Sequence, residues 1–579
     1  MLKHIKSYLS KQKIDFLYLT NTDEFFNEYL PQNQQRIQAI TGFSGSNAEV
    51  IFGVSKSYFF TDGRYLLQAQ KQLDLEEYEI IDIAQISVIA WLKSNLGQQK
   101  IAIFSKLSSI KFVSQLEKIP NKNVKFIEEI FIDELWQDRP LSINSRIFSL
   151  SDTLSGMTSI NKRKLILSKI IGDALLITRS DDLCWLLNIR AKDLEYSPLL
   201  LKYAILYKDL SVDLFIDEKK IKGLNIEKIN CVAENCLDLR FKIIRKSLNS
   251  IDIDFSSTNY FIFNLLQKNN FIINDHHSPI QLAKAVKNNA EIAGIKKAHY
   301  LDGLALVKFI LWFKKIVNQQ AISEIEAQKK LLEFRKENNG FFSESFATIS
   351  GFASNSAIIH YHAVESCQKK IEGNSLYLID SGGQYFGHDF MGTTDITRTL
   401  LVGKVDDEMI KYYTLVLKGH LALARVKFPK GLAGLNLDSL ARFYLWQFNL
   451  DYQHGTGHGV GAFLGVHEGP CAISSRNNCP LLPNMVLSNE PGFYLANKYG
   501  IRLENLQRVV EVSDNFLGFE TLSFAPFEPE LVDFKMLTYP EKKWLGHYHQ
   551  TIMDNYCHML DDQSRTDLVK ICQPFITKF

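Results

Sequence analysis

The stretch LYLIDSGGQYFGHDFMGTTDITRTL, residues 376–400, decides the fold of the second half of this chain. Its first residues are apolar and β-prone, which is typical of a strand buried on both faces, and that run ends at Asp380. The later segment TTDIT is again rich in β-branched residues and contains Asp395. Glycines lie between the two runs, so we expect an antiparallel hairpin. If the two aspartates face each other, the turn is centred between Gly387 and His388, and both carboxylates project from one face.

Three further polar residues occur in similar settings downstream: His458 in HGTGHGVG, Glu490 in SNEPGFY and Glu504 in IRLENL. A single acidic residue in such a place can simply cap a turn. Five buried ionisable groups would each cost several kcal/mol unless they are paired or bind metal. One imidazole and four carboxylates suit two divalent ions such as Mn²⁺, Co²⁺, Fe²⁺ or Zn²⁺, whose charge the carboxylates balance. Such ions turn water into a nucleophile at neutral pH.

These motifs resemble the metallopeptidase family that includes methionine aminopeptidase, prolidase, creatinase and Xaa-Pro aminopeptidase, whose catalytic domain has the pita-bread fold. DSGGQY, GTTDITRT, HGTGHGVGAFLGVHEGP, NEPGFY and GIRLEN occur in the order that the family keeps. The resemblance covers nearly the whole chain and is closest to the long, three-domain cytosolic members. It implies that Asp380 holds one metal ion, that His458 and Glu490 hold the other, and that Asp395 and Glu504 bridge the two.

The resemblance also implies roles for residues that contact substrate. His360, in AIIHYH, and His467, in VHEGP, lie where the family keeps histidines that hydrogen-bond substrate carbonyls or the developing oxyanion. Glu490 would pass a proton to the leaving proline nitrogen, and His458 would also touch substrate. Arg64, in TDGRY, matches an arginine that reaches substrate, although the Asp-Gly pair before it is also typical of a hairpin turn with a surface strand residue after it.

Several neighbouring residues keep two interpretations. His362 stays undecided, and His454 is expected on the same strand face as His458, where it would orient the metal ligands. Three apolar residues beside His360 either line a pocket for the proline ring or pack in the core: Phe352, Ile358 and Ile359.

The chain departs from the family between the two aspartates. Members typically place eleven positions there, whereas Asp380 and Asp395 are fifteen apart, so residues 386–391 carry four additional residues. Two residues added to each arm keep the facing of both aspartates, and we expect a longer hairpin with an intact site. His388 and Asp389 could serve as extra ligands, but a loop tip is the expected place for both.

Length and an internal similarity divide the chain into parts. At 579 residues it exceeds a single core. The motif IDFLYLT followed by Thr22-Asp23 recurs as ALLIT followed by Ser180–Asp182; in both places we expect a strand and then a helix, hence two related α/β domains. Polar stretches with proline mark boundaries near 138–140 and 276–279. We therefore expect an α/β (α+β) chain with two creatinase-like domains, a pita-bread catalytic domain and a helical tail, at residues 1–140, 141–278, 279–540 and 541–579.

Composition excludes several other classes of protein. With 46% hydrophobic residues, 22% charged residues and a net charge of +2, the chain gives no nucleic-acid signal. No apolar run reaches membrane-spanning length, and the N-terminus leads into Lys11-Gln12-Lys13 instead of an apolar signal core. The eight cysteines lack CxxC spacing, which disfavours a thiolate zinc site and favours free thiols in a reducing cytoplasm.

The resemblance implies a dinuclear aminopeptidase that releases the N-terminal residue from peptides with proline in second position. Mn²⁺ is the favoured metal, with Zn²⁺ or Co²⁺ as alternatives, and a cytoplasmic homodimer formed through the catalytic domains is expected. Two other functions stay open: a prolidase acting on Xaa-Pro dipeptides, and a catalytically silent module that binds peptides or proteins. The additional domain disfavours the first, and the complete ligand set disfavours the second and also a metal-free creatinase.

Overall fold

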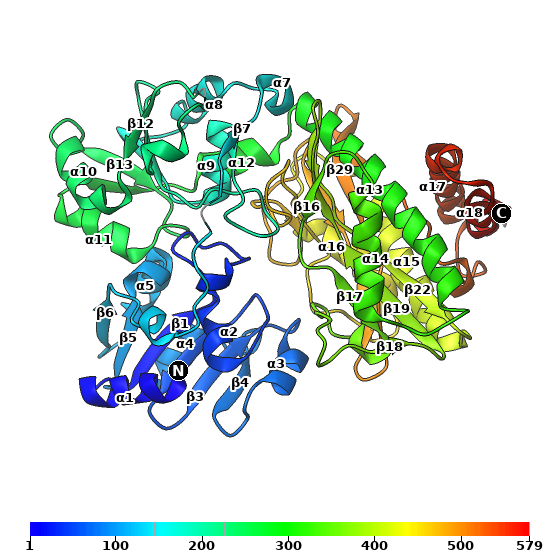
Figure 1. The fold of residues 1–579 in the computed structure, drawn as a ribbon, viewed down its shortest axis with the longest axis horizontal. Coiled ribbons are helices and arrows are strands. Elements are labelled where there is room, and N and C mark those ends of the chain that lie inside the picture. Colours follow the sequence, from blue (N-terminus) through cyan, green and yellow to red (C-terminus); the bar gives the residue numbers. More distant parts are fainter. Residues whose placement is uncertain (144, 225, 578–579) are drawn as a thin grey trace. The chain divides into compact units, whose positions relative to one another are not determined.

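The computed structural model describes residues 1–143, 145–224 and 226–577. It contains two units, one made of Met1–Asp152 with Met157–Gln281 and the other of Thr153–Gly156 with Leu282–Phe579 (Figure 1). Among the described residues, no helix is both long and apolar enough to cross a membrane.

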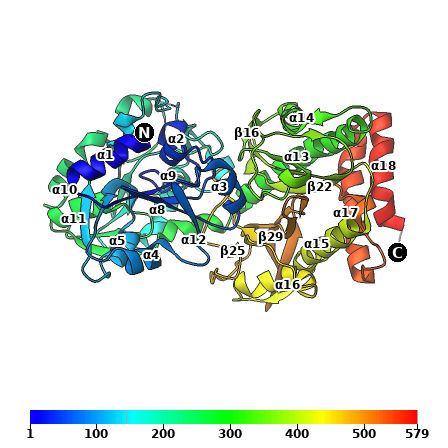
Figure 2. The same ribbon diagram turned by 90° about the horizontal axis from the view of Figure 1, so that it is seen from below.

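The first half of the N-terminal unit is a six-stranded sheet in the order β4-β3-β2-β1-β5-β6. Its elements are α1 (Leu2–Gln12), β1 (Phe16–Thr20), η1 (Gln32–Gln34), α2 (Arg36–Thr41), β2 (Glu49–Gly53), β3 (Ser57–Thr61), α3 (Leu66–Gln72), β4 (Tyr78–Asp82), α4 (Val88–Asn95), β5 (Lys100–Phe104), η2 (Ser105–Leu107), α5 (Ile110–Leu116), β6 (Asn123–Ile127) and α6 (Ile132–Leu135). Side chains alternate along β1: Leu17 and Leu19 join the core under α1 and α2, and Tyr18 joins the core under α4 and α5. Figure 2 shows the two pairs of helices on opposite sides of this sheet.

The second half of this unit repeats the arrangement, with strand order β12-β11-β10-β8-β13-β14. Its elements are β7 (Phe148–Ser149), α8 (Ser159–Leu167), β8 (Ala174–Ile177), α9 (Ser180–Leu187), β9 (Ile189–Arg190), β10 (Ala204–Tyr207), β11 (Val212–Phe215), η3 (Glu218–Lys220), β12 (Ile229–Val232), η4 (Glu234–Cys236), α10 (Leu237–Ile244), β13 (Ser250–Ile253), α11 (Tyr260–Lys268) and β14 (Ile272–Asp275). The helices α7 (Asp152–Ser155) and α12 (Pro279–Ala285) each contain residues of both units. Both β1 and β8 have one antiparallel and one parallel neighbour. The predicted internal repeat is therefore confirmed at the level of topology.

One detail of that repeat was predicted wrongly. α9 begins at Ser180 as expected, but no helix begins at Thr22-Asp23. There the Asp23 carboxylate accepts hydrogen bonds from the backbone amides of Phe25 and Asn27, both at 3.0 Å. This side-chain turn satisfies the amides that a first helical turn would otherwise leave open.

The C-terminal unit consists of small sheets and several long helices that pack on them. Its elements are α13 (Asn289–Ile316), β15 (Ile322–Ser323), α14 (Glu324–Lys336), β16 (Phe341–Glu344), β17 (Ile349–Phe352), η5 (Ala353–Asn355), β18 (Lys370–Ile371), β19 (Ser375–Ser381), β20 (Gly383–Phe386), β21 (Met391–Thr393), β22 (Ile396–Val402), α15 (Asp407–Arg425), β23 (Phe428–Pro429), α16 (Leu435–Trp446), β24 (Gly457–His458), β25 (Ala472–Ile473), β26 (Val486–Asn489), β27 (Gly492–Leu495), β28 (Tyr499–Arg502), β29 (Asn505–Ser513), β30 (Phe516–Thr521), η6 (Pro529–Leu531), α17 (Tyr539–Tyr556), η7 (Cys557–Met559) and α18 (Asp562–Thr577). α13 begins where expected, with a capping box between Asn288 and Glu291. Phe309 and Phe313 of α13 pack on Tyr377 of β19, as the crossing of α13 over these strands in Figure 1 indicates.

The predicted hairpin between Asp380 and Asp395 exists, but its register differs from the prediction by two residues. Asp380 pairs with Thr397, and the turn is centred between His388 and Asp389. Gly387 N donates to Phe390 O at 2.9 Å, so the exposed pair His388-Asp389 forms a tight turn that sets the register. Because side chains alternate with a period of two, the shift leaves both aspartates on one face as diagonal neighbours. That this hairpin is four residues longer than in the family stays a prediction.

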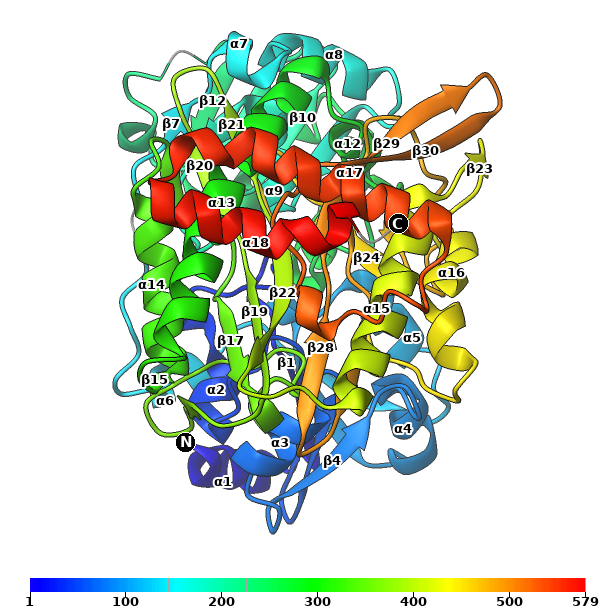
Figure 3. The same cartoon turned by 90° about the vertical axis from the view of Figure 1, so that its right-hand side faces the viewer.

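The C-terminal helices pack on the strands of this unit. α17 and α18 lie side by side in Figure 3. Tyr548 of α17 accepts a hydrogen bond from Arg398 Nη2 at 2.8 Å. Arg398, fully buried in β22, also donates to the backbone oxygen of Glu504 at 2.7 Å. The helical tail is thus tied to the backbone of a predicted metal ligand.

Candidate metal centre

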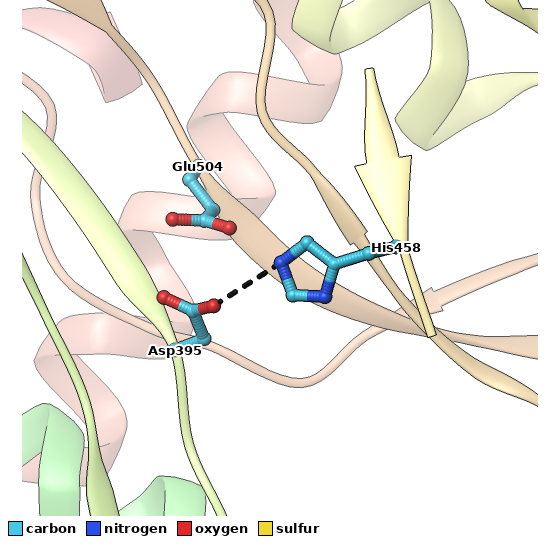
Figure 4. Close-up of side chains that lie close together, drawn as sticks. All are labelled: Asp395, His458 and Glu504. Atoms are coloured by element: carbon cyan, nitrogen blue, oxygen red, sulfur yellow. Dashed lines mark ion pairs between the residues drawn. The ribbon is translucent and has the colours of Figure 1, made fainter. Parts of the chain in front are cut away.

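Three of the five predicted ligands converge from distant parts of the sequence. Asp395 lies between β21 and β22, His458 ends β24, and Glu504 lies in the short link between β28 and β29. Figure 4 shows the three side chains pointing toward one another, and one ligand atom from each lies within 4.8 Å of the others. His458 Nε2 is 3.4 Å from Asp395 Oδ2.

Glu490 completes the histidine side of the site. It directly follows β26, and its Oε1 is 3.6 Å from His458 Nε2. His458 Nδ1 lies 3.1 Å from its neighbour's oxygen, Gly459 O, so Nδ1 donates there and Nε2 remains the ligand atom. Ser488 accepts from the backbone amide of His458 at 2.9 Å and donates to Glu490 at 3.2 Å. One hydroxyl therefore fixes both residues.

Asp380 lies on the opposite side and is held by an arginine. Arg502 Nη2 donates to Asp380 Oδ2 at 2.6 Å, and Arg502 is almost fully buried. Within the described part of the chain, Asp380 Oδ1 and Asp395 Oδ1 are buried without a hydrogen-bond partner. Buried carboxylate oxygens in native proteins normally have a partner, so these two are positioned to coordinate a cation.

The electrostatics of the cluster point the same way. Burial raises the pKa of Asp395 well above its usual range, and the charges of Asp380 and Glu490 raise it further. The pKa of Glu504 is likewise raised well above its ordinary value by burial and then by Asp395. Burial also raises the pKa of Glu490, against the favourable charge of His458. Two dications would remove this repulsion, so the residues present fit a dinuclear site.

The two predicted substrate histidines lie on loops of the same unit. The ring of His467 is perpendicular to that of His458, with the centroids 4.3 Å apart. His360 lies in the turn after η5, where the next residue, Tyr361, donates through its hydroxyl to Glu324 at 2.8 Å. Glu324 is buried and also accepts from the backbone amide of Lys369 at 2.8 Å. One carboxylate thus closes the loop that carries His360.

The apolar residues predicted beside His360 are buried in the core. Phe352 belongs to the core beneath α13, and Ile358 to a small cluster with Leu378. Ile359 is also buried, and burial lowers the pKa of His362. A proline pocket formed by these apolar residues stays a prediction.

Arg64 lies in the N-terminal unit and pairs with Asp62. Its guanidinium donates to both carboxylate oxygens, at 2.9 and 2.7 Å, and Asp62 also accepts from the Arg64 amide. The Asp-Gly pair leads into α3, so it is not the turn of a hairpin. Arg64 lines a cavity of about 490 Å³ together with Tyr18, Asn47 and Glu49. Its contact with substrate stays a prediction.

Sequence reasoning placed one histidine wrongly and missed two partners. His454 lies in a bend before β24, not on a shared strand face with His458. Its Nε2 accepts from Tyr494 OH at 2.9 Å, and its Nδ1 is 3.8 Å from Glu490 Oε2. Arg502 Nη1 donates to the same Tyr494 hydroxyl at 2.7 Å, which links the two sides of the site. The alternation of IRLE, which puts Arg502 and Glu504 on one face, was the available signal for Arg502.

Family models match almost the whole chain. Residues 293–511 match metallopeptidase family M24, and residues 515–575 match the C-terminal region of that family. Residues 1–134 and 138–291 each match the creatinase/prolidase N-terminal domain. A protein of Sordaria macrospora named "Probable Xaa-Pro aminopeptidase P" is 36% identical, and the alignment covers 99% of each chain. This chain belongs to metallopeptidase family M24.

Solved structures of M24 proteins agree with that assignment. The crystal structure of X-prolyl aminopeptidase from Caenorhabditis elegans, described as a cytosolic enzyme with a di-nuclear active site, is 32% identical. It matches 99% of this M24 chain and 98% of its own length, with a TM-score of 0.92. The prolidase of Pyrococcus horikoshii OT3 is 25% identical with a TM-score of 0.51 and covers 64% of this chain. The predicted fold class, two creatinase-like domains before an M24 catalytic domain, is confirmed.

Proposed function

We propose that this chain is a dinuclear metallo-aminopeptidase that releases the N-terminal residue from peptides with proline in second position. The observation that carries the proposal is the convergence of Asp395, His458 and Glu504 within 4.8 Å, on a chain similar over its whole length to Xaa-Pro aminopeptidases. Asp380 and Glu490 complete the ligand set, and two divalent ions, with Mn²⁺ favoured over Zn²⁺ or Co²⁺, would occupy it. The domain limits 1–140, 141–278, 279–540 and 541–579 are part of the same proposal.

The chain's own residues divide the work of peptide hydrolysis. Two bound divalent ions supply Lewis acidity and lower the pKa of water. Glu490, beside His458, is placed to accept a proton from the attacking water and to deliver it to the proline nitrogen. His467 and His360 would donate hydrogen bonds to the carbonyl oxygen as negative charge develops there.

Two further residues keep the carboxylates in place during this reaction. Thr397 donates to Glu504 Oε2 at 2.8 Å, and Arg502 donates to Asp380. Each contact occupies one oxygen of its carboxylate and restrains the position of that side chain. Preorganised ligands of this kind need no rearrangement when charge develops.

Proline explains why such a peptidase is needed. Its nitrogen carries no hydrogen and its ring fixes φ, so a protease that binds substrates as extended strands loses a hydrogen bond at that position. Asp380, Asp395, His458, Glu490 and Glu504 would hold divalent ions that activate water, and this chemistry would not require that hydrogen bond.

A metal-reconstitution assay separates this function from its two rivals. The purified protein is stripped of metal, reloaded with Mn²⁺, Zn²⁺ or Co²⁺, and assayed on Gly-Pro and on Arg-Pro-Pro. Release of arginine from Arg-Pro-Pro supports the proposal. Cleavage of Gly-Pro alone would indicate a prolidase, and no cleavage with any ion would indicate a binding module.

Localisation and assembly belong to the same proposal. We infer a cytoplasmic enzyme, supported by the cytosolic relative from Caenorhabditis elegans and by eight cysteines that form no disulfide among the described residues. We also infer a homodimer through the catalytic domain. An aromatic face at the end of α16 supports it, since Phe443, Trp446 and Phe448 are 50, 45 and 43% exposed. Light scattering of the purified protein tests the dimer.

A further inference from the structure

The hairpin that carries the two aspartates continues beyond them and ends in an aromatic contact. Phe386, at the end of β20, stacks on Phe463 with the ring centroids 5.3 Å apart and the planes 8° from parallel. Phe342 of β16 meets the same ring edge-on at 5.2 Å and 83°. Phe463 is fully buried. We call these three residues the aromatic clamp.

We call the segment 459–467, which follows His458 and ends at His467, the histidine loop. Phe463 lies at its tip. Its φ of 54° is in the left-handed region, which costs a bulky residue about 1–2 kcal/mol unless its surroundings hold it. The loop is closed by two backbone hydrogen bonds, from Gly461 N to Gly465 O at 3.0 Å and from Glu468 N to Gly459 O at 2.8 Å. The tip is therefore a strained turn that needs support from outside the loop.

The hairpin supplies polar support as well. Gln384 Nε2 donates to Leu464 O at 2.8 Å, and Leu464 N donates to Thr393 Oγ1 at 3.3 Å. The two hairpin residues that make these bonds, Gln384 and Thr393, are fully buried. The histidine loop is thus docked on β20 and β21 through one aromatic stack and through hydrogen bonds between the backbone of Leu464 and the side chains of Gln384 and Thr393.

The other end of the loop is fixed independently. Glu468, the residue after His467, is buried and pairs with Lys287 Nζ at 2.7 Å. Lys287 lies between α12 and α13, and its amide donates to Asn484 O at 3.2 Å. With Glu468 anchored on one side and Phe463 on the other, the direction of the His467 ring depends on both anchors.

We infer that Phe386 is a positioning residue for His467, acting through Phe463. This inference rests on the proposed function, because it assigns His467 to the peptidase reaction. One rigid hairpin would then carry Asp380 and Asp395 and also hold the histidine that faces the substrate carbonyl. Phe386 belongs to the stretch 386–391, for which the sequence predicts additional residues relative to the family, and the aromatic clamp would give that stretch a function.

The decisive variant is Phe386→Ala, with Phe390→Ala as its matched control. Phe390 is an aromatic residue of the same hairpin whose ring lies against Gly340 and Gly387. We expect Phe386→Ala to lower kcat on Arg-Pro-Pro about tenfold or more, since a misplaced reacting group costs rate steeply. Its metal content and KM should stay near those of the control. Phe386→Tyr, which keeps the ring, should restore kcat to within about twofold.

A double-variant experiment tests the route through His467. If Phe386 acts by positioning that ring, Phe386→Ala should have little further effect on kcat in a His467→Ala background. The same fold-loss in both backgrounds would overturn the inference, as would equal activity of Phe386→Ala and Phe390→Ala.

A readout without catalysis separates this inference from the proposed function. Hydrogen exchange by mass spectrometry should show faster exchange of residues 459–468 in Phe386→Ala than in Phe390→Ala. Unchanged protection of that segment would refute the docking argument, whatever the wild-type protein hydrolyses. Faster exchange in a protein that cleaves no Xaa-Pro peptide with any ion would support the clamp and refute only the proposed function.

Discussion

Asp395→Asn separates two roles of this carboxylate: its proposed role as a metal ligand and its contribution to the repulsion between buried charges. Asp395 is 4% exposed and has a ligand atom within 4.8 Å of one from Glu504. At an effective dielectric constant of about 20, two ionised carboxylates at that separation repel by about 3 kcal/mol. Asparagine keeps the shape and removes the charge.

The variant should therefore become inactive and, without metal, more stable. Protonation already relieves part of the repulsion in the metal-free wild type, so we expect the unfolding free energy of the metal-free variant to rise by about 1–3 kcal/mol. Turnover should fall by about 10³-fold or more, because a lost bridging ligand removes several kcal/mol of transition-state stabilisation.

The assay combines urea unfolding of EDTA-treated protein, metal analysis and release of arginine from Arg-Pro-Pro. Asp389→Asn is the control, because that residue is exposed at the tip of the same hairpin. It should change neither quantity. An active variant with two bound ions would refute the bridging role of Asp395, and a metal-free variant no more stable than wild type would refute the electrostatic argument.

Three other outcomes follow from particular contacts. The pKa values of Asp395 and Glu504 are raised above their ordinary values of 3.8 and 4.5. At a pH above these ordinary values, the folded metal-free protein therefore binds more protons than the unfolded chain does. Its melting temperature should therefore fall as pH rises from about 5 to 8, and added Mn²⁺ should remove that slope; a flat metal-free profile would contradict the shifts. Glu324→Gln should cost about 1–3 kcal/mol of unfolding free energy and lower kcat/KM at unchanged metal content, since it loosens the loop of His360; kinetics equal to wild type would show that the loop does not need this anchor. Trp446→Glu should convert a dimer into monomers in light scattering, and an intact dimer would place the interface elsewhere.

The candidate metal ligands were accessible from sequence because each occurs in a short motif whose neighbours restrict the backbone. Asp380 lies one residue before the end of an apolar strand, and Glu490 directly follows another, so local pattern and chemistry agree. The repeat of two related sheets was accessible for the same reason, through the apolar strands that begin each half. Patterns within one strand carry this information without knowledge of the rest of the fold.

Features that depend on two distant segments were not accessible. The register of the hairpin depends on the turn at His388-Asp389 and on the pairing of β20 with β16, which no local pattern shows. The partners of Tyr494 required knowing that Arg502 and His454 approach the same hydroxyl. Such side-chain contacts are a product of tertiary packing, and a single sequence gives no direct signal for them.

The tie between Arg398 and Tyr548 has a consequence for the order of events during synthesis. Arg398 also holds the backbone oxygen of Glu504, so this part of the site gains the support of Tyr548 only after α17 has left the ribosome. At about 5–20 residues per second, translation from the end of the N-terminal unit to Tyr548 takes about 13–53 s. During that interval the backbone of Glu504 lacks the support that α17 gives it through Arg398.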